Sequence, residues 1–299
     1  MLKKNRNIAR LFTLVLLVMI CVIFQIPKLA TCSTKEEKIV IRYSDHTPPV
    51  SPPARAVVHW QKIIIERTGG KVVFQNTFGG SLLSEADIFR GIEKGIADMA
   101  WYPLNPRDGF KANTVMMLPF MGWPDRETAT LIFEELLKKF PAMRGEWRTV
   151  KLLSPAVMLP THFHMVRKTV SKPDDLRGLK IATTGEHTEI IKNLGAVPVE
   201  IPIGDWFTAL ERGVVDGCLN HFAVLKVFAF LEKVGVHVVF GEGGVNVTPQ
   251  VILMNIDTWE KLPKDVQRVF EETQKEWWKK MYEIDMTEYV DSAIAAAKK

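Results

Sequence analysis

The stretch KPDDLRGLKIATTGEHTEIIKNLGAVPVEIPIGDWFTALERGVVDGCLN, residues 172–220, decides the fold. Three of its segments have the length and apolar character of strands: 179–183, 197–201 and one that begins at Val214. The two segments between them have helical periodicity and end at Gly195 and Gly213, as glycine readily takes the positive φ of a helix C-terminus. Because single helices separate the strands, the sequence predicts parallel pairing in an α/β layer.

The same pattern occurs a second time, earlier in the chain. The segment DIFRGIEKGIAD at 87–98 aligns with DWFTALERGVVD at 205–216, with Asp, Phe, Glu, a basic residue, Gly and Asp in register. The residues before position 87 also alternate strand-like and helix-like segments. Two α/β lobes whose strands meet at their carboxyl ends enclose a cleft, which is where open α/β sheets bind ligands. The sequence therefore predicts two lobes with a site between them.

The N-terminus has the composition of a secretory signal peptide. Four basic residues within the first ten positions precede an apolar run at 11–24, and small residues follow at 30–33. The run is shorter than the roughly 20 residues of a membrane span. We expect residues 1–32 to be removed by cleavage after Cys32, and lipidation of Cys32 is the alternative.

The charge of the chain changes when this segment is removed. The whole sequence has 39 Lys and Arg against 34 Asp and Glu, but five of the basic residues and none of the acidic ones lie in residues 1–32. The remaining 34 basic and 34 acidic residues balance, which gives no support to nucleic-acid binding. Cys218 would be the last remaining cysteine, so a domain of about 265 residues would be stabilised by burial rather than by an internal disulfide.

Four motifs carry a resemblance to a known family: 174–181 (DDLRGLKI), 209–217 (ALERGVVDG), 118–120 (LPF) and 259–263 (WEKLP). Over about residues 38–290 the chain resembles the DctP-type solute-binding proteins of tripartite ATP-independent periplasmic (TRAP) transporters. The resemblance implies a periplasmic-binding-protein-like clamshell of the α/β class, each lobe a mixed sheet flanked by helices. It also implies a periplasmic monomer, without catalytic residues, metal or cofactor, that closes on a small organic acid and delivers it to membrane subunits.

The resemblance also implies how the chain divides. Lobe I would comprise 38–160 and about 249–280, and lobe II would comprise 161–248 and about 281–299. The hinge would then lie near residues 160 and 248. Closure of such lobes around a ligand is a hinge motion driven by contacts that exist only in the closed state.

Matching positions to the family gives nine expected ligand contacts: His46, Glu85, Trp101, Tyr102, His162, Thr183, Trp206, Asn220 and Gln250. Core packing is the alternative for Trp101 and Trp206. At Ala182 the family usually has an arginine that binds the ligand carboxylate, so another cation or another kind of ligand is required. Candidate cations are Arg107, Arg167, Lys168 and Lys180. Several aromatic residues without that arginine favour a larger or aromatic acid.

Two other functions are open at this point. His162 and His164 share a face if they lie on a strand, so they could ligate one Zn²⁺ in a secreted metallohydrolase, given a third ligand. The same clamshell could alternatively present its ligand to a membrane receptor as a sensor. Sequence does not separate sensing from transport, because the two roles share a ligand site and differ in the partner.

Overall fold

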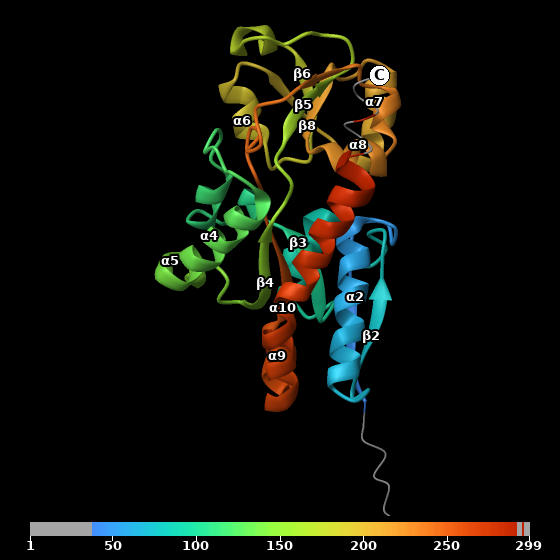
Figure 1. Cartoon of the computed structure of the whole chain (residues 1–299), viewed down its shortest axis with the longest axis vertical. Coiled ribbons are helices and arrows are strands. Elements are labelled where there is room, and N and C mark those ends of the chain that lie inside the picture. Colours follow the sequence, from blue (N-terminus) through green and yellow to red (C-terminus); the bar gives the residue numbers. More distant parts are fainter. Residues whose placement is uncertain (1–37, 292–294, 296–299) are drawn as a thin grey trace, which may run out of the picture. The chain divides into compact units, whose positions relative to one another are not determined.

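The computed structural model describes residues 38–291 and residue 295 (Figure 1). The expected signal peptide, its cleavage site and the expected lipidation of Cys32 lie outside these residues. Within the described part of the chain, no helix is both long and apolar enough to cross a membrane.

The first sheet has five strands in the order β2-β1-β3-β10-β4. Their bounds are β1 Ile39–Ser44, β2 Val72–Thr77, β3 Met99–Pro103, β4 Val150–Val157 and β10 Pro249–Asn255. Strand β1 is parallel to β2 and β3, whereas β10 runs antiparallel to both β3 and β4. The parallel pairs follow from the helices α2 (Pro52–Arg67) and α3 (Ile88–Glu93), because parallel neighbours need a crossover connection.

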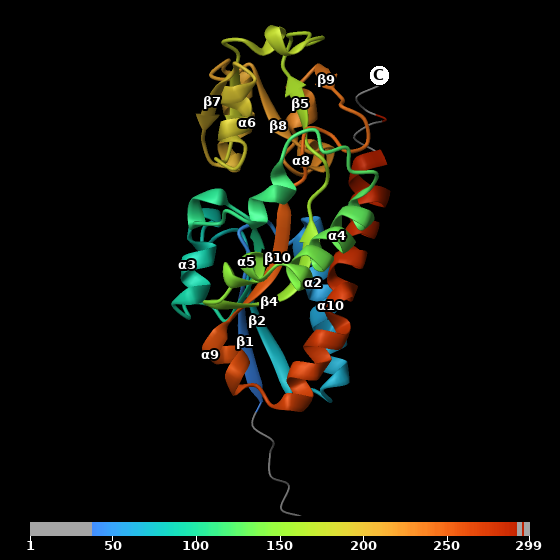
Figure 2. The same ribbon diagram turned by 90° about the vertical axis from the view of Figure 1, so that its left-hand side faces the viewer.

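The second sheet has the order β7-β6-β8-β5-β9 (Figure 2). Its strands are β5 His162–Met165, β6 Lys180–Thr183, β7 Val197–Glu200, β8 Gly217–Asn220 and β9 Val236–Val238. Strand β6 is parallel to β7 and β8, and helices α6 (Thr188–Asn193) and α7 (Trp206–Glu211) connect them. The α/β layer predicted for residues 172–220 is therefore confirmed, and so is the fold class of two mixed sheets flanked by helices.

The other helices cover the sheets and join them. They are α4 Arg126–Lys139, α5 Pro141–Gly145, α8 Phe222–Val227, α9 Ile256–Lys261 and α10 Lys264–Ile284, with a wider π-type turn, η7, at Asp285–Val290. Short 3₁₀ turns lie at Glu85–Asp87 (η1), Pro106–Asp108 (η2), Asn113–Met117 (η3), Pro173–Leu176 (η4), Ile203–Asp205 (η5) and Phe230–Glu232 (η6). Helix α10 packs along α2 and β4, and η7 continues it to α8 beside the second sheet (Figure 1).

Each sheet has its own hydrophobic core. Between α2 and α10, the Trp60 ring meets Phe270 edge to face at 5.8 Å, and its Nε1 donates to Thr273 Oγ1 at 2.8 Å. In the second sheet, Cys218 on β8 is fully buried, and this burial raises the pKa of its thiol to about 12. Burying a large apolar side chain contributes about 1.5–3 kcal/mol, so both cores stabilise their sheets independently.

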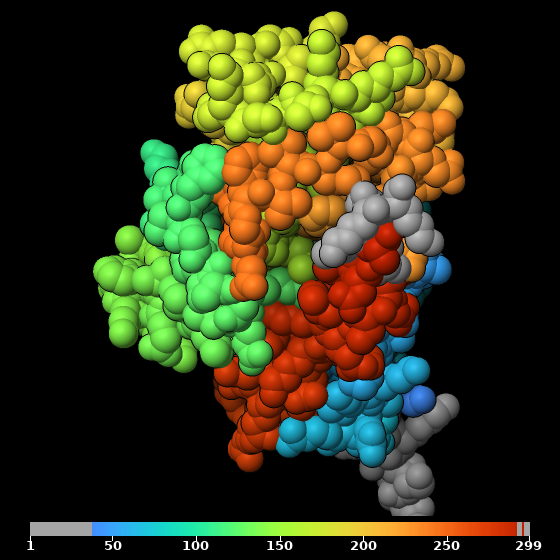
Figure 3. Space-filling model, turned by 45° about the horizontal axis from the view of Figure 1, so that its top comes forward, coloured from blue at the N-terminus to red at the C-terminus, as the bar shows by residue number. Residues whose placement is uncertain are grey.

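Two segments cross between the sheets and lie side by side. Residues 158–161 lead from β4 to β5, and residues 239–248 return from β9 to β10. They pair through the Met158, Thr161 and Val245 amides, which donate to Thr248 O, Asn246 O and Thr161 O at 2.8, 2.9 and 2.7 Å. The return segment also contacts the loop 118–123, where the Phe120 amide donates to Val245 O at 2.7 Å (Figure 3).

Candidate ligand-binding site

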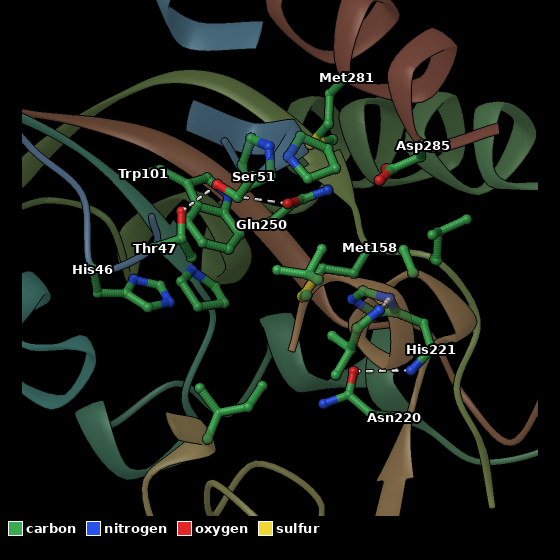
Figure 4. Close-up of a pocket in the computed structure, with 18 of the residues that line it drawn as sticks. His46, Thr47, Ser51, Trp101, Met158, Asn220, His221, Gln250, Met281 and Asp285 are labelled. Carbon is green, nitrogen blue, oxygen red and sulfur yellow. Dashed lines mark hydrogen bonds between the residues drawn. The ribbon is translucent and has the colours of Figure 1, made fainter. Parts of the chain in front are cut away.

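A cavity lies where the two sheets face each other (Figure 4). The space between its walls, open solvent included, is about 750 Å³. First-sheet strands and their loops supply His46, Trp101 and Gln250, and second-sheet segments supply Glu186 and Asn220. Met281 of α10 and Asp285 of η7 complete the wall.

Five of the nine predicted contacts line this cavity: His46, Glu85, Trp101, Asn220 and Gln250. Trp101 on β3 donates from Nε1 to Gln250 Oε1 at 2.9 Å, and Gln250 Nε2 donates to Val157 O at 2.8 Å. These bonds hold the indole across the β3–β10 pair. The His46 ring stacks on it, with centroids 4.8 Å apart and an interplanar angle of 12°.

His46 and Glu85 form a weakly coupled pair at one end of the cavity. His46 Nε2 lies 3.8 Å from Glu85 Oε2. Burial lowers the pKa of His46 to about 3 and raises the pKa of Glu85 to about 7. The imidazole is therefore neutral near pH 7, so the contact is not an ion pair there.

Tyr102 and Trp206 lie inside the two cores, away from the cavity. The Tyr102 hydroxyl donates to Asp108 Oδ2 at 2.6 Å, while Trp206 donates from Nε1 to Ile201 O at 3.0 Å and stacks on Phe230. Successive residues of a strand point to opposite faces, so Trp101 and Tyr102 of β3 do not face one cavity together. For Trp206 the structure shows the core packing that was the alternative.

Thr183 and His162 are also absent from the cavity lining among the described residues. The Thr183 hydroxyl is buried and accepts a hydrogen bond from the Gly185 amide at 3.2 Å, and the next residue, Thr184, lines the cavity instead. His162 packs beside Phe222, with ring centroids 5.4 Å apart, and burial lowers its pKa to about 4. Their role as ligand contacts stays a prediction without support from this cavity.

Ala182 itself does not line the cavity. Ala182 is fully buried in the core that contains Trp206, Ala209 and Leu210. The four cations suggested from sequence do not line the cavity in the described part of the chain: Arg107, Arg167, Lys168 and Lys180. Arg107 instead pairs with Glu200 at the end of β7.

The cation that does line the cavity is Arg126, the first residue of α4. Its guanidinium is 8% exposed, lies 3.5 Å over the Tyr282 ring and donates from Nη1 to Asp285 Oδ2 at 2.6 Å. Its Nη2 is buried and has no hydrogen-bond partner among the described residues. Sequence reasoning missed Arg126, because no local signal marks it and its partner Asp285 is 159 positions away.

Glu186, which precedes α6, is a second cavity residue that sequence reasoning missed. Burial raises the pKa of its carboxyl to about 8, and the nearby charge of Glu85 adds to the shift. Its Oε1 lies 3.3 Å from His187 Nδ1, and burial lowers the pKa of His187 to about 3. The turn between β6 and α6 thus brings a carboxyl group to the cavity.

The histidines considered for zinc are engaged otherwise. His164 Nδ1 lies 2.9 Å from His237 Nδ1, and His164 Nε2 lies 3.0 Å from Asn220 O. Across residues 38–291 and 295, no group of three His, Cys, Asp or Glu side chains is arranged to hold a metal ion. The geometry gives the metallohydrolase alternative no third ligand.

Comparison with known proteins identifies the family. A family model described as bacterial extracellular solute-binding protein, family 7 (DctP) matches residues 43–299. A solute-binding protein of Verminephrobacter eiseniae is 25% identical over 241 residues, which cover 80% of this chain and 71% of that protein. The crystal structure of a TRAP periplasmic solute-binding protein from Desulfovibrio salexigens is 30% identical, with a TM-score of 0.71 over 87% of this chain and 80% of that one.

A further solved structure supports the same fold. A TRAP solute-binding protein from Rhodoferax ferrireducens, solved with copurified benzoate, has a TM-score of 0.77 at 22% identity and covers 87% of this chain and 83% of that one. The family match spans both sheets and the cavity between them. The chain therefore belongs to the bacterial extracellular solute-binding protein family 7, the DctP family of TRAP transporter solute-binding proteins.

Proposed function

We propose that this protein captures a small organic acid in the cavity and that Arg126 receives the ligand carboxylate. Two observations carry the proposal: Arg126 lines the cavity, and its buried Nη2 has no hydrogen-bond partner among the described residues. A charge-assisted hydrogen bond to a carboxylate would satisfy this donor, and would contribute about 1.5–3 kcal/mol. Arg126 would thereby replace the arginine that relatives usually have at position 182.

The shape of the cavity supports a ligand with an apolar or aromatic body. Trp101, Met158 and Val224 line it together with Pro52 and Phe228. Structurally similar TRAP proteins have been solved with copurified benzoate and with bound (R)- and (S)-mandelate, which are aromatic acids. Another has been solved with β-D-galacturonate, which is a sugar acid. For this chain, we propose an acid large enough to reach from Arg126 to Trp101.

The two sheets are proposed as two lobes that close on the ligand, lobe I of 38–160 and about 249–280 and lobe II of 161–248 and about 281–299. The paired crossing segments near 160 and 248 would be the hinge. The protein would act as a periplasmic monomer that delivers its ligand to TRAP membrane subunits, without catalysing a reaction. Sensing for a receptor would use the same site, so deletion of the membrane subunits separates the roles: uptake is lost only if the protein serves transport.

The first test is a thermal-shift screen of the purified protein against aliphatic, keto-, hydroxy-, amino- and aromatic acids with neutral analogues. A ligand at a hundredfold excess over its Kd stabilises the folded protein by about 2.7 kcal/mol. We expect a shift with acids and none with the matching amides. Shifts with the amides alone would contradict the role of Arg126.

Asn220→Ala is expected to weaken ligand binding at least tenfold, as measured by isothermal titration calorimetry. Asn220 ends β8 at the cavity, and its Oδ1 accepts a hydrogen bond from the His221 amide at 2.8 Å, which directs the side-chain amide. Truncation would leave the ligand group that Asn220 binds unsatisfied in a site that excludes water, at a cost of about 1–3 kcal/mol, or about 2 kcal/mol in the middle of this range. The melting temperature of the empty protein should change little, and an unchanged affinity would remove Asn220 from the site.

A further inference from the structure

The cavity has more acidic groups than cations. Among the described residues, its lining includes three carboxyl groups, those of Glu85, Glu186 and Asp285, and a single guanidinium, that of Arg126. Asp285 and Arg126 form an ion pair with both side chains almost fully buried. Glu85 and Glu186 therefore remain without a cation, in a protein whose proposed ligand is itself an anion.

The two glutamates have no hydrogen-bond donor of their own within the described residues. Their contacts are the His46 nitrogen at 3.8 Å from Glu85 and the His187 nitrogen at 3.3 Å from Glu186. Burial keeps both imidazoles neutral near pH 7, so neither supplies a positive charge. Both glutamate side chains are partly exposed, Glu85 by 29% and Glu186 by 11%, so an external donor can reach them and would favour their ionised form.

Two further polar atoms of the cavity residues have no partner of their own. The ring of His46, only 10% exposed, has a buried Nδ1 with no partner in the described part of the chain, and it lies against Trp101 (Figure 4). At another part of the cavity, Arg126 Nη2 is likewise buried and unpartnered. One cavity thus offers a cationic donor in one place and acceptors without donors in another.

We infer that the ligand is an amino-bearing organic acid, whose carboxylate binds Arg126 and whose ammonium group lies between Glu85 and Glu186. This inference rests on the proposed function and narrows its ligand class. Glu85 comes from η1 beside the first sheet, and Glu186 precedes α6 of the second sheet. An ammonium group between them offsets the repulsion between two carboxylates contributed by opposite halves, so binding and closure stabilise each other.

The inference determines how affinity depends on pH. The carboxyl pKa is raised to about 7 at Glu85 and to about 8 at Glu186, so protons occupy these groups at pH 6. An ammonium ligand binds the ionised form and releases these protons to solvent, so its affinity rises from pH 6 to pH 8. A ligand held only as a carboxylate, by protonated glutamates, would instead lose affinity over this range.

Other titratable groups near the cavity do not give the same pH dependence. The pKa values of His46, His187 and His221 are lowered to about 3 by burial, and these rings stay neutral over the whole range. The pKa of Asp45 is raised to about 6 by burial, but Tyr43 and Thr47 enclose its carboxyl, outside the cavity lining. Nearby charged groups are paired with each other, Arg126 with Asp285 and Arg107 with Glu200, and the Tyr102 hydroxyl donates to Asp108.

The test measures binding of matched probes that differ by one group. For each carbon skeleton, the set contains the acid, the amino acid and the amine: 3-phenylpropionate, phenylalanine and phenethylamine; 4-methylpentanoate, leucine and isopentylamine. Because the spacing of the two groups is not fixed in advance, 4-aminobutyrate, 5-aminovalerate and 3-(aminomethyl)benzoate are included with their parent acids. Calorimetric titrations are made at pH 6 and pH 8.

We expect the tightest probe to contain both groups, to bind at least tenfold tighter than its parent acid at pH 8, and to gain at least tenfold from pH 6 to pH 8. Glu85→Gln/Glu186→Gln should abolish both differences, because glutamine keeps the shape and removes the charge. Glu189→Gln, at an exposed site on α6 next to Glu186, is the matched control and should leave both unchanged.

The possible results separate this inference from the proposed function. If a parent acid binds as tightly as its amino derivative, the inferred ammonium site is contradicted and acid binding still stands. The same holds if the double variant keeps the higher affinity for the amino derivative or the rise in affinity from pH 6 to pH 8. If amines bind as tightly as the amino acids, the Arg126 contact is wrong. If no probe in the panel binds, both the ligand class and the acid-binding function are contradicted.

Discussion

Arg126→Met is expected to weaken binding of the acid about 10- to 150-fold and to destabilise the empty protein by about 3–5 kcal/mol. The loss of affinity follows from one charge-assisted hydrogen bond of about 1.5–3 kcal/mol. The loss of stability follows because Asp285, 6% exposed, would remain as a buried charge without its partner. For a chain of this size, such a loss lowers the melting temperature on the order of 10 °C.

A second variant separates the two effects. Arg126→Met/Asp285→Asn removes the orphaned charge, so its melting temperature should return most of the way to that of the parent while the affinity stays low. Burial raises the pKa of Asp285, and Arg126 opposes this rise. In the single variant the folded-state pKa therefore rises further above the unfolded value of about 3.9, so the stability deficit grows from pH 4 to pH 8. Unchanged affinity in both variants would contradict the role of Arg126.

Gly244→Ala is expected to destabilise the protein by about 3 kcal/mol or more, in urea denaturation. Gly244 has a φ of +59° in the return segment, a conformation that raises the energy of other residues by about 1–2 kcal/mol. A Cβ at this position would lie 2.5 Å from Thr161 O and 2.8 Å from the Pro160 Cβ. Because these atoms belong to the other crossing segment, relief of the clash requires the two segments to separate, at a further cost of about 1–3 kcal/mol.

The matched control is Gly241→Ala, three residues away in the same segment. Its φ is +67°, but no other group of the described residues lies within 4 Å of the position that its Cβ would take. This variant should therefore lose only about 1–2 kcal/mol of unfolding free energy, the cost of the left-handed backbone conformation. Equal losses in the two variants would show that the crossing segments do not constrain each other at Gly244.

The parts of the fold that sequence predicted well are those with local signals. Residues 172–220 form the expected alternation of strands and helices, because apolar periodicity and helix-ending glycines act within a few residues. The third strand, expected to begin at Val214, begins instead at Gly217. The repeat also has a structural counterpart. Helix α3 followed by β3 in the first sheet corresponds to α7 followed by β8 in the second.

The site was less predictable from sequence. It depends on which face of a strand each side chain occupies and on contacts between residues far apart in the sequence. His46 and Asn220, which follow or end a strand, do line the cavity, since the carboxyl ends of strands meet there. Choosing between adjacent strand residues such as Trp101 and Tyr102 requires knowing which face is covered by helices. Arg126 and Asp285 are 159 positions apart in the sequence, and Asp285 reaches Arg126 because it lies in the π-type segment that follows α10. No local sequence pattern predicts such a contact.

The burial of Cys218 gives the protein an internal reporter of its own opening. It is the sole cysteine in the described residues, it is fully shielded on β8, and its raised pKa leaves almost no thiolate. Thiol reagents attack the thiolate, so modification must wait until the second sheet opens locally. The rate of labelling by a disulfide reagent, followed with and without ligand, would thus measure how firmly a bound solute holds that sheet together, without any introduced probe.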